Sequence, residues 1–256
     1  MIGSPQTRRT APLAGRRTRR TAPLAGRRTR RGAPLAAALI AAALLALALA
    51  PPHRAAAWDP ACGGPQTAKA QRNPNPGGRP PLAIGDSTML LALPNLAAEG
   101  YTVNARGCRQ ITEGLGLLRD LRRQGRLPHL VVIALGADAS ISRGQLGRVF
   151  NLLGGKRVLG LVTPRELGGG TSSDADAVRA AAKRHPRRAV LLDWVAYSAG
   201  HADWFQPDGL HLTLTGAQAF ARLLRQALPY AGAGAFPGGP PSGEMGLSPA
   251  VPAPAR

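Results

Sequence analysis

The sequence predicts an α/β domain in which a parallel β-sheet carries helices on both faces. Between about residues 81 and 230, short apolar runs alternate with longer segments of helical periodicity. The short runs are apolar throughout, which is typical of strands that are covered on both faces. A segment of roughly 150 residues is also long enough to bury one hydrophobic core.

Five strands and five helices are expected, and they alternate along the chain. The strand candidates are Leu82–Ile84, Tyr101–Ala105, Leu130–Leu135, Val158–Val162 and Val190–Leu192. The helix candidates are Thr88–Ala98, Ile111–Gln124, Arg143–Leu153, Ser172–His185 and Thr213–Leu228. Because each strand is followed by a helix, the strands are expected to run parallel in one sheet.

Small or polar residues lie within three positions after four of these strand candidates. They are Ser87, Gly107, Asp138 and Thr163. The carboxyl ends of parallel strands lie at one edge of a sheet, and ligands of such sheets bind there. We therefore expect these four residues to share one site.

The N-terminal arm, residues 1–32, is basic and repetitive. The run Arg-Arg-Thr-Ala-Pro-Leu begins at Arg8 and Arg19 and returns at Arg30 with Gly in place of Thr. The copies are too short for a solenoid, and the proline in each opposes a continuous helix. We expect a disordered arm. It either attracts anionic lipid or nucleic acid, or forms the long basic region of an export signal, which we favour.

Residues 33–57 are predicted to be a signal peptide or a membrane anchor. Positions 33–50 hold no charged residue, and Ala55–Ala57 before Trp58 offers an A-x-A cleavage site. The uncharged run is also just long enough to span a bilayer, so the two alternatives stay open. Both place the remaining chain outside the cytoplasm, secreted or anchored. A buried helix of a soluble domain is disfavoured because the run has no polar face.

The rest of the chain divides by composition into a linker, the α/β domain and a tail. Residues 58–80 are rich in Pro and Gly and are predicted to form a linker. The domain is expected at 81–230. Residues 231–256 are mostly Gly, Pro and Ala, which predicts a disordered tail.

The stretch Gly85-Asp86-Ser87 lies at a predicted strand-to-helix corner. Such a corner exposes a serine hydroxyl, and the helix N-terminus offers unpaired N–H groups to a developing anion. The alternative is that Asp86 or Ser87 only caps the helix. Asp208 and His211 lie three residues apart before the last helix. They supply the other two members of a Ser–His–Asp set.

Gly85-Asp86-Ser87 and Asp208-Gly209-Leu210-His211 resemble the first and last blocks of the SGNH (GDSL-type) hydrolase family. They are most similar to the SGNH domains of cell-envelope O-acyltransferases and acetyl esterases. The resemblance implies a flavodoxin-like three-layer α/β/α sandwich around a five-stranded parallel sheet. It also implies that Ser87 is the nucleophile, that His211 is its base and that Asp208 orients the imidazole. His201 is the rival base, but it lacks the family's spacing.

The resemblance also implies the groups that stabilise the oxyanion. They are the backbone N–H groups of Ser87 and Gly107 and, from the third block, an Asn side chain. This chain has Asp138 where the family has that Asn. An ionised Asp accepts hydrogen bonds but donates none. Asp138 is then protonated, or Asn104 or Arg109 replaces it, or activity is low.

The chain has two cysteines, Cys62 and Cys108. Outside the cytoplasm such a pair can oxidise, so we expect a disulfide. Two free thiols, or lipid attachment at Cys62, are the alternatives.

Other classes of function have little support in the sequence. No set of His and Cys has the spacing of metal ligands, and there is no phosphate-binding loop, so no metal or cofactor is expected. Only 4% of residues are aromatic, and half of the net charge of +20 comes from the ten Arg of the arm, so no nucleic-acid partner is expected. Trp194 and Trp204 either stack on sugar rings or pack a loop. The oligomeric state is not predicted.

Together these features predict an exported serine esterase or O-acyltransferase that acts through an acyl-serine intermediate. The expected substrates are small acyl, above all acetyl, esters of cell-envelope carbohydrate. The sequence has no acyl-transporting membrane domain, which favours the hydrolase over the transferase. The alternative is a non-catalytic SGNH-fold module that binds glycan or supports the envelope and has a degenerate oxyanion hole.

Overall fold

The computed structural model describes residues 62–171 and 173–237. The basic arm, the predicted signal or anchor segment and residues 238–256 lie outside the described residues. Within the described ranges, no helix combines the length and the apolar character that crossing a membrane requires.

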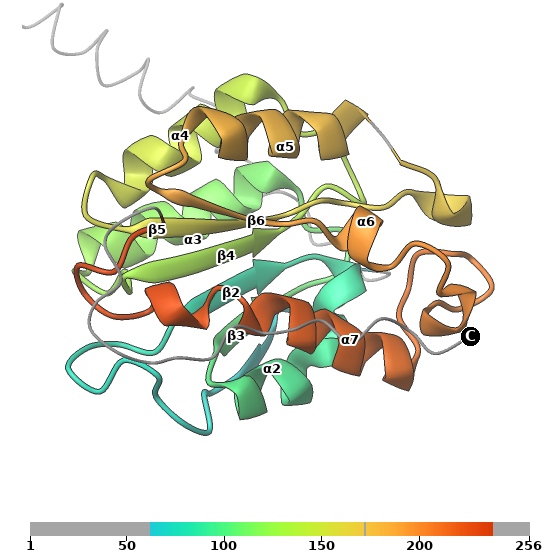
Figure 1. Cartoon of the computed structure of the whole chain (residues 1–256), viewed down its shortest axis with the longest axis horizontal. Coiled ribbons are helices and arrows are strands. Elements are labelled where there is room, and N and C mark those ends of the chain that lie inside the picture. The colour runs from blue at the N-terminus through green and yellow to red at the C-terminus, as the bar shows by residue number, and fades with distance from the viewer. Residues whose placement is uncertain (1–61, 172, 238–256) are drawn as a thin grey trace, which may run out of the picture. The chain divides into compact units, whose positions relative to one another are not determined.

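A six-stranded sheet forms the centre of the domain (Figure 1). Its strands are β1 (Gln66–Ala68), β2 (Leu82–Gly85), β3 (Thr102–Ala105), β4 (Leu130–Ala134), β5 (Val158–Val162) and β6 (Ala189–Leu192), in the order β1-β3-β2-β4-β5-β6. Strands β2 to β6 are parallel to one another. The predicted α/β fold with five parallel strands is therefore confirmed.

The sixth strand is a correction. β1 runs antiparallel to β3 at the edge of the sheet, and it lies inside the segment expected to be a linker. Its sequence, Gln-Thr-Ala, is mostly exposed and has no apolar alternation. It pairs through its backbone, so hydrophobic patterning gives no signal for it.

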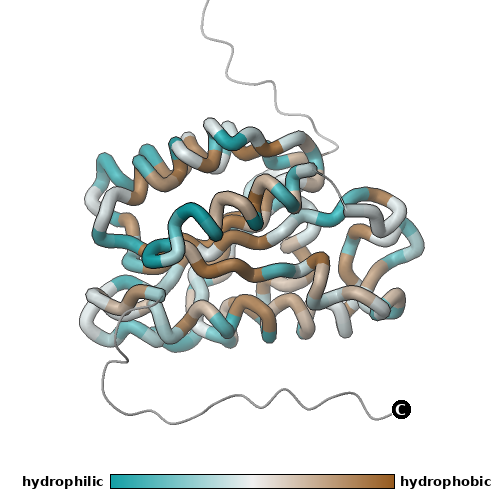
Figure 2. The backbone as a smooth tube through the Cα atoms, turned by 45° about the horizontal axis from the view of Figure 1, so that its top comes forward, coloured by the Kyte–Doolittle hydropathy of each residue, from teal (hydrophilic) through white to brown (hydrophobic). Residues whose placement is uncertain are grey.

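Helices cover both faces of the sheet, which gives three layers (Figure 1). One face packs against α2 (Leu93–Glu99), α6 (Trp194–Tyr197) and α7 (Leu214–Arg225). The other packs against α3 (Ile111–Arg123), α4 (Arg143–Leu153) and α5 (Ser173–Arg184). The central strands β2, β4 and β5 are buried along their length, and hydrophilic colour is concentrated on the helices and loops around the sheet (Figure 2). This agrees with a parallel sheet buried on both faces.

The first predicted helix is divided into two parts. A 3₁₀ helix, η2 (Ser87–Ala92), precedes α2, and a proline stands in the first turn of α2. Proline lacks the N–H that a continuous α-helix would use, so the chain restarts there. Gly100 ends α2 in the left-handed conformation with φ of 106°. Ser87 is the first residue of η2 and therefore lies at the start of this pair of short helices.

The beginning of the predicted tail is ordered against the domain, which corrects that expectation. Ala231 follows η5 (Leu228–Tyr230) and is 1% exposed. Further on, Phe236 packs edge-on against the His129 ring at 5.3 Å between centroids, and the His129 Nε2 lies 3.1 Å from the Ala235 carbonyl oxygen. Small residues in this segment fit closely where composition alone indicated disorder.

Candidate active site

The carboxyl edge of the sheet gathers the predicted site residues. β2 lies between β3 and β4 in the sheet. The connection from β2 leads to β3 on one side of it, and the connection from β3 then crosses to β4 on the other side. A crevice forms at such a reversal in strand order, and ligands bind there. Gly85 at the end of β2 pairs with Ala105 at the end of β3. Ser87 and Gly107 each follow two residues later, which places both at this crevice.

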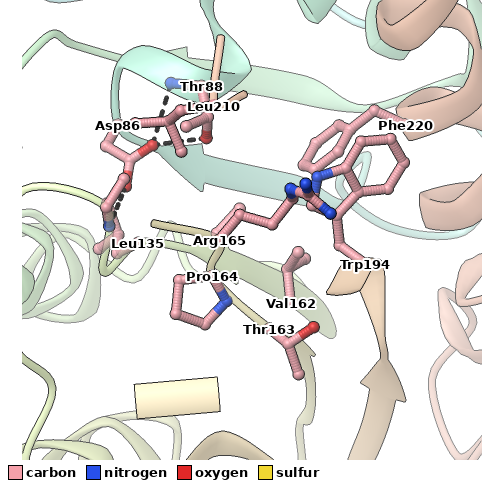
Figure 3. Close-up of a pocket in the computed structure, with 12 residues that line it drawn as sticks. Asp86, Thr88, Leu135, Val162, Thr163, Pro164, Arg165, Trp194, Leu210 and Phe220 are labelled. Carbon is pink, nitrogen blue, oxygen red and sulfur yellow. Dashed lines mark hydrogen bonds between the residues drawn. The ribbon is translucent and has the colours of Figure 1, made fainter. Parts of the chain in front are cut away.

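Asp86 fixes the corner that presents Ser87. It is 1% exposed, and its Oδ1 accepts hydrogen bonds from the Thr88 N–H at 3.1 Å and the Thr88 hydroxyl at 2.6 Å. Its Oδ2 accepts from the Ala137 N–H at 3.2 Å, which ties the corner to the loop after β4 (Figure 3). Asp86 is thus the cap, and the Ser87 hydroxyl is left available.

Burial raises the pKa of Asp86 to about 6. The hydrogen bonds from Thr88 and Ala137 oppose this effect, and the nearby charge of Asp138 adds to it. A buried carboxylate is costly unless donors surround it. Burial, opposed by the hydrogen bonds from Thr88 and Ala137, therefore sets how much of Asp86 is ionised near neutral pH.

Ser87, His211 and Asp208 form a continuous chain of hydrogen bonds. The His211 Nε2 lies 3.0 Å from the Ser87 Oγ, and the His211 Nδ1 lies 2.6 Å from the Asp208 Oδ2. An ionised carboxylate only accepts, so the proton between Asp208 and His211 belongs on Nδ1. Nε2 is then free to accept the proton of the Ser87 hydroxyl.

Asp208 also builds the turn that carries His211. Its Oδ1 accepts from the backbone N–H groups of Leu210 and His211, both at 2.9 Å. The hydrogen bond to the His211 side chain, with these backbone donors, lowers the pKa of Asp208 to about 2. Gly209 has φ of 68°, in the left-handed region that favours glycine. The same carboxylate thus shapes the loop and orients the imidazole.

The loop after β5 holds the Asp208–His211 turn from outside. The Arg165 Nε donates to the Gly209 carbonyl at 3.3 Å, and its Nη1 donates to the Ser198 hydroxyl at 3.1 Å. The guanidinium also lies 4.1 Å above the centre of the Phe205 ring. A side chain added at Gly209 would meet the backbone of this loop at 2.7 Å. Arg165 therefore positions the turn from which His211 projects.

An aromatic cluster supports the segment that leads into this turn. Trp194 and Trp204 are 4% and 8% exposed and stack at 5.8 Å between centroids. His201 stacks on Trp204 at 3.8 Å, which uses its ring in packing. A Cβ at Gly216 would overlap the Trp204 carbonyl, so only glycine allows α7 to approach. Of the two interpretations of these tryptophans, loop packing is the one that the structure shows.

Gly107 lies in a loop pinned by a disulfide bond. Cys62 and Cys108 are joined, with 5.4 Å between their Cα atoms. A Cβ at Gly107 would lie 2.5 Å from the Cys62 carbonyl oxygen, so the bridged segment packs directly on this glycine. Cys108 itself has φ of 54°, a strained conformation that the loop must hold in place.

Asp138 lies in the loop after β4, near His211 and Asp86. The pKa of Asp138 is raised above its usual value, because partial burial has a larger effect than the opposing interaction with His211. Asn104 and Arg109 were proposed to replace the oxyanion donor that Asp138 cannot supply. In the structure these two residues are hydrogen-bonded to each other. The Arg109 Nη2 donates to the Asn104 Oδ1 at 2.7 Å, and its Nη1 donates to the Asn104 and Gly85 carbonyls. This buried arginine holds the ends of β2 and β3 together.

Two hollows lie beside Thr88, the residue that follows Ser87. The inner one is lined by Asp86, Ala137, Pro164, Arg165, Leu210 and others (Figure 3). The outer one is an open groove of about 400 Å³ lined by Gln66, Ser87, Thr88, Leu90, Leu91, Gln206, His211 and Leu212. The Ser87 hydroxyl and the His211 ring thus face a groove that is open to solvent.

The chain is similar in sequence to part of several O-acetyltransferases. The chain is 30% identical over 149 residues to the peptidoglycan O-acetyltransferase OatA of Listeria monocytogenes, and 27% identical over 157 residues to the O-acetyltransferase OatA of Staphylococcus aureus. It covers 24% of the length of each relative, and these matches span 57% and 56% of the chain. No family model matches the chain.

Among solved structures, the chain resembles the C-terminal catalytic domain of Streptococcus pneumoniae peptidoglycan O-acetyltransferase A, which carries a methylsulfonyl adduct. The TM-score is 0.52 at 22% identity, and the match covers 60% of this chain and 94% of that domain. The chain has the SGNH hydrolase fold. The predicted family resemblance and its fold are thereby confirmed.

Two contacts at this site have no signature in the sequence. The Arg165 clamp and the Asp86 bond to Ala137 join residues that are far apart in the chain. Thr163 lines the inner hollow, and its hydroxyl is bonded within the fold, since it donates to Asp193 at 2.9 Å and accepts from the Val195 N–H at 3.0 Å. Among the described residues, no group of three or more His, Cys, Asp or Glu side chains could hold a metal ion.

Proposed function

We propose that this protein is an exported SGNH-type serine esterase or O-acyltransferase. Its substrates are small acyl esters, above all acetyl esters, of cell-envelope carbohydrate. The observation that supports this most is the hydrogen-bonded series from Ser87 Oγ through His211 to Asp208, with distances of 3.0 and 2.6 Å. The similarity to peptidoglycan O-acetyltransferases supports the choice of an envelope glycan as the acyl carrier.

In the first half-reaction, the Ser87 Oγ attacks the carbonyl carbon of the ester while His211 Nε2 takes the hydroxyl proton. Asp208 holds the imidazole and stabilises its positive charge. The negative charge that develops on the carbonyl oxygen lies at the start of η2, where the backbone N–H of Ser87 and that of Gly107 are its donors. His211 then gives the proton to the departing sugar oxygen as the carbon–oxygen bond breaks.

The second half-reaction resolves the acyl-Ser87 intermediate. His211 takes a proton from water or from a sugar hydroxyl, whose oxygen attacks the acyl carbon. The proton returns to Ser87 as its bond to the acyl group breaks. Water as acceptor gives an esterase, and a sugar hydroxyl gives a transferase. The groove beside Ser87 is open to solvent, so both acceptors have access.

Two features support the proposal that this domain is exported, namely the apolar segment at 33–50 and the Cys62–Cys108 disulfide. Disulfides persist mainly outside the cytoplasm. The segment would act either as a cleaved signal or as a membrane anchor.

Labelling of the full chain with a fluorophosphonate probe tests the enzymatic function. The probe reacts with a serine activated by a neighbouring base, so we expect a stoichiometric adduct on Ser87 and none in Ser87→Ala. Ser173→Ala, at the exposed start of α5, is the matched control and should label as the parent does. An unlabelled parent chain that is correctly folded would contradict the proposal.

Asp138 favours a second candidate, a non-catalytic module that binds glycan. A carboxylate in the place of an oxyanion donor opposes the charge that forms in the reaction. This candidate predicts a chain that binds envelope saccharides but neither labels with the probe nor hydrolyses a simple acetyl ester.

A further inference from the structure

The groove beside the triad has the size of a small-molecule site but an unusual lining for so basic a chain. Its volume of about 400 Å³ falls within the range of ligand pockets, roughly 300–1,000 Å³. Residues 58–256 carry 22 Lys and Arg against 13 Asp and Glu, yet the groove is lined by two glutamines, two hydroxyl groups, three leucines and His211. No Lys, Arg, Asp or Glu is among the residues that line it.

This lining matches a neutral, hydroxylated ligand. Amide side chains offer both donors and an acceptor to hydroxyl or acetamido groups. Leucine side chains offer an apolar surface to the C–H face of a sugar ring. A phosphorylated or otherwise anionic ligand would lose its water here without gaining a charged partner.

The two glutamines differ in how they are held. The Gln206 Nε2 donates to the Leu212 carbonyl at 3.2 Å, and its backbone N–H donates to the His211 carbonyl at 2.7 Å. Gln206 therefore supports the loop that carries the base. Gln66 instead comes from β1, and it is exposed at the wall of the groove.

The wall that carries Gln66 is fixed at several points. β1 pairs with β3, where Gln66 lies opposite Ala105. The disulfide at Cys62 holds the segment before it, and the bond from the Gln71 N–H to the Ala97 carbonyl holds the segment after it. A side chain on such a fixed strand meets a ligand with little loss of backbone freedom.

We propose that Gln66 is a specificity-determining residue that hydrogen-bonds the neutral sugar ring bearing the ester. This inference rests on the proposed function and refines its substrate class. The N-terminal strand then selects glycan esters over small esters that do not reach the wall. Alternation along β1 turns Thr67 away from the Gln66 side of the sheet, so Thr67 provides a matched control.

The test uses the full chain and compares two acetyl esters, an O-acetylated oligosaccharide of N-acetylglucosamine and 4-nitrophenyl acetate. We expect Gln66→Ala to lower the ratio of kcat/KM for the saccharide to kcat/KM for the small ester by about 5- to 10-fold, the size of one uncharged hydrogen bond. Thr67→Ala should keep the ratio within about twofold. An unchanged ratio in Gln66→Ala would overturn the inference.

A binding experiment separates this inference from the proposed catalysis. In a Ser87→Ala background, the Kd for the same oligosaccharide of N-acetylglucosamine without its O-acetyl groups is measured with and without Gln66→Ala. We expect the second substitution to weaken binding about fivefold or more. Equal affinities, or a parent that does not bind the saccharide, overturn the role of Gln66 even if Ser87 labels. A parent that binds through Gln66 but does not label would contradict only the catalytic proposal.

Discussion

The His211 Nε2 lies 3.0 Å from the Ser87 Oγ, although 124 residues separate the two in the chain. Ser87 is held by a buried capping carboxylate at the end of β2, and His211 by a turn built around Asp208. The contact therefore depends on two independently supported corners.

The first prediction concerns the charge of Asp138. Replacing it with Asn removes a carboxylate near the site and supplies a donor, so turnover of an activated acetyl ester should rise. One oxyanion donor is worth about 10²–10³ in rate, and we expect a gain of at least about tenfold. Steady-state kinetics of Asp138→Asn measure this. Asp120→Asn, an exposed change of equal charge on α3, should leave turnover as it was. Equal or slower turnover in Asp138→Asn would place Asp138 outside the oxyanion site.

The second prediction concerns the contacts of Arg165 with Gly209, Ser198 and Phe205. Arg165→Ala should slow fluorophosphonate labelling about tenfold, because the turn that carries His211 loses its contacts with the β5 loop. Lysine presents one ammonium and cannot bond Gly209 and Ser198 together while stacking on Phe205, so Arg165→Lys should recover only part of the rate.

The exposed Arg148→Ala on α4 provides the control for lost positive charge, and circular dichroism checks the fold of each variant. Labelling of Arg165→Ala at the parent rate would show that the clamp does not position the base.

The third prediction concerns the disulfide. The variant Cys62→Ser/Cys108→Ser should lose roughly 2–4 kcal/mol in free energy of unfolding, the usual effect of a native bridge. Turnover should also fall in conditions where the variant is still folded, because the bridge holds the Gly107 loop and β1. Denaturant unfolding and ester hydrolysis of the same samples measure the two effects. A less stable variant with full turnover would mean that Gly107 is positioned without the bridge.

The fourth prediction concerns pH and Asp86. Its pKa of about 6 lies above the model-peptide value, so the folded chain binds this proton more tightly than the unfolded chain does. Stability due to Asp86 is therefore greatest below about pH 4 and falls as the pH rises through 6. The stability of the parent relative to Asp86→Asn should fall by on the order of 3 kcal/mol between pH 4 and 7. Unfolding curves across that range measure it, and a constant difference would refute the shift.

The parallel core was predictable because continuous apolar runs and helical segments alternate from Leu82 onward. β1 was not, since Gln66–Ala68 pairs through its backbone and buries little. The order at Ala231 and Phe236 was also missed, because small residues and one aromatic fit the domain only once it has folded.

Within the site, spacing pointed to Ser87, Asp208 and His211 as a set, since their residue types carry the chemistry. The capping role of Asp86 was among the alternatives that the sequence offered, but its bond to Ala137 and the role of Arg165 could not be read in the same way. Asp86 bonds the Ala137 amide and Arg165 bonds the Gly209 carbonyl, and both partners are backbone groups that have no residue signature. Such contacts follow from how distant loops pack.

The central claim is that Ser87 forms the acyl intermediate with His211 as its base. It is tested most directly by mixing the full chain with an activated acetyl ester, quenching in acid and locating the acetyl group by peptide mass spectrometry. We predict one acetyl group on the peptide that contains Ser87, and a rate of acetylation at least about 10³-fold lower in His211→Ala. An acetyl group on another residue, or unchanged acetylation in His211→Ala, would contradict the account.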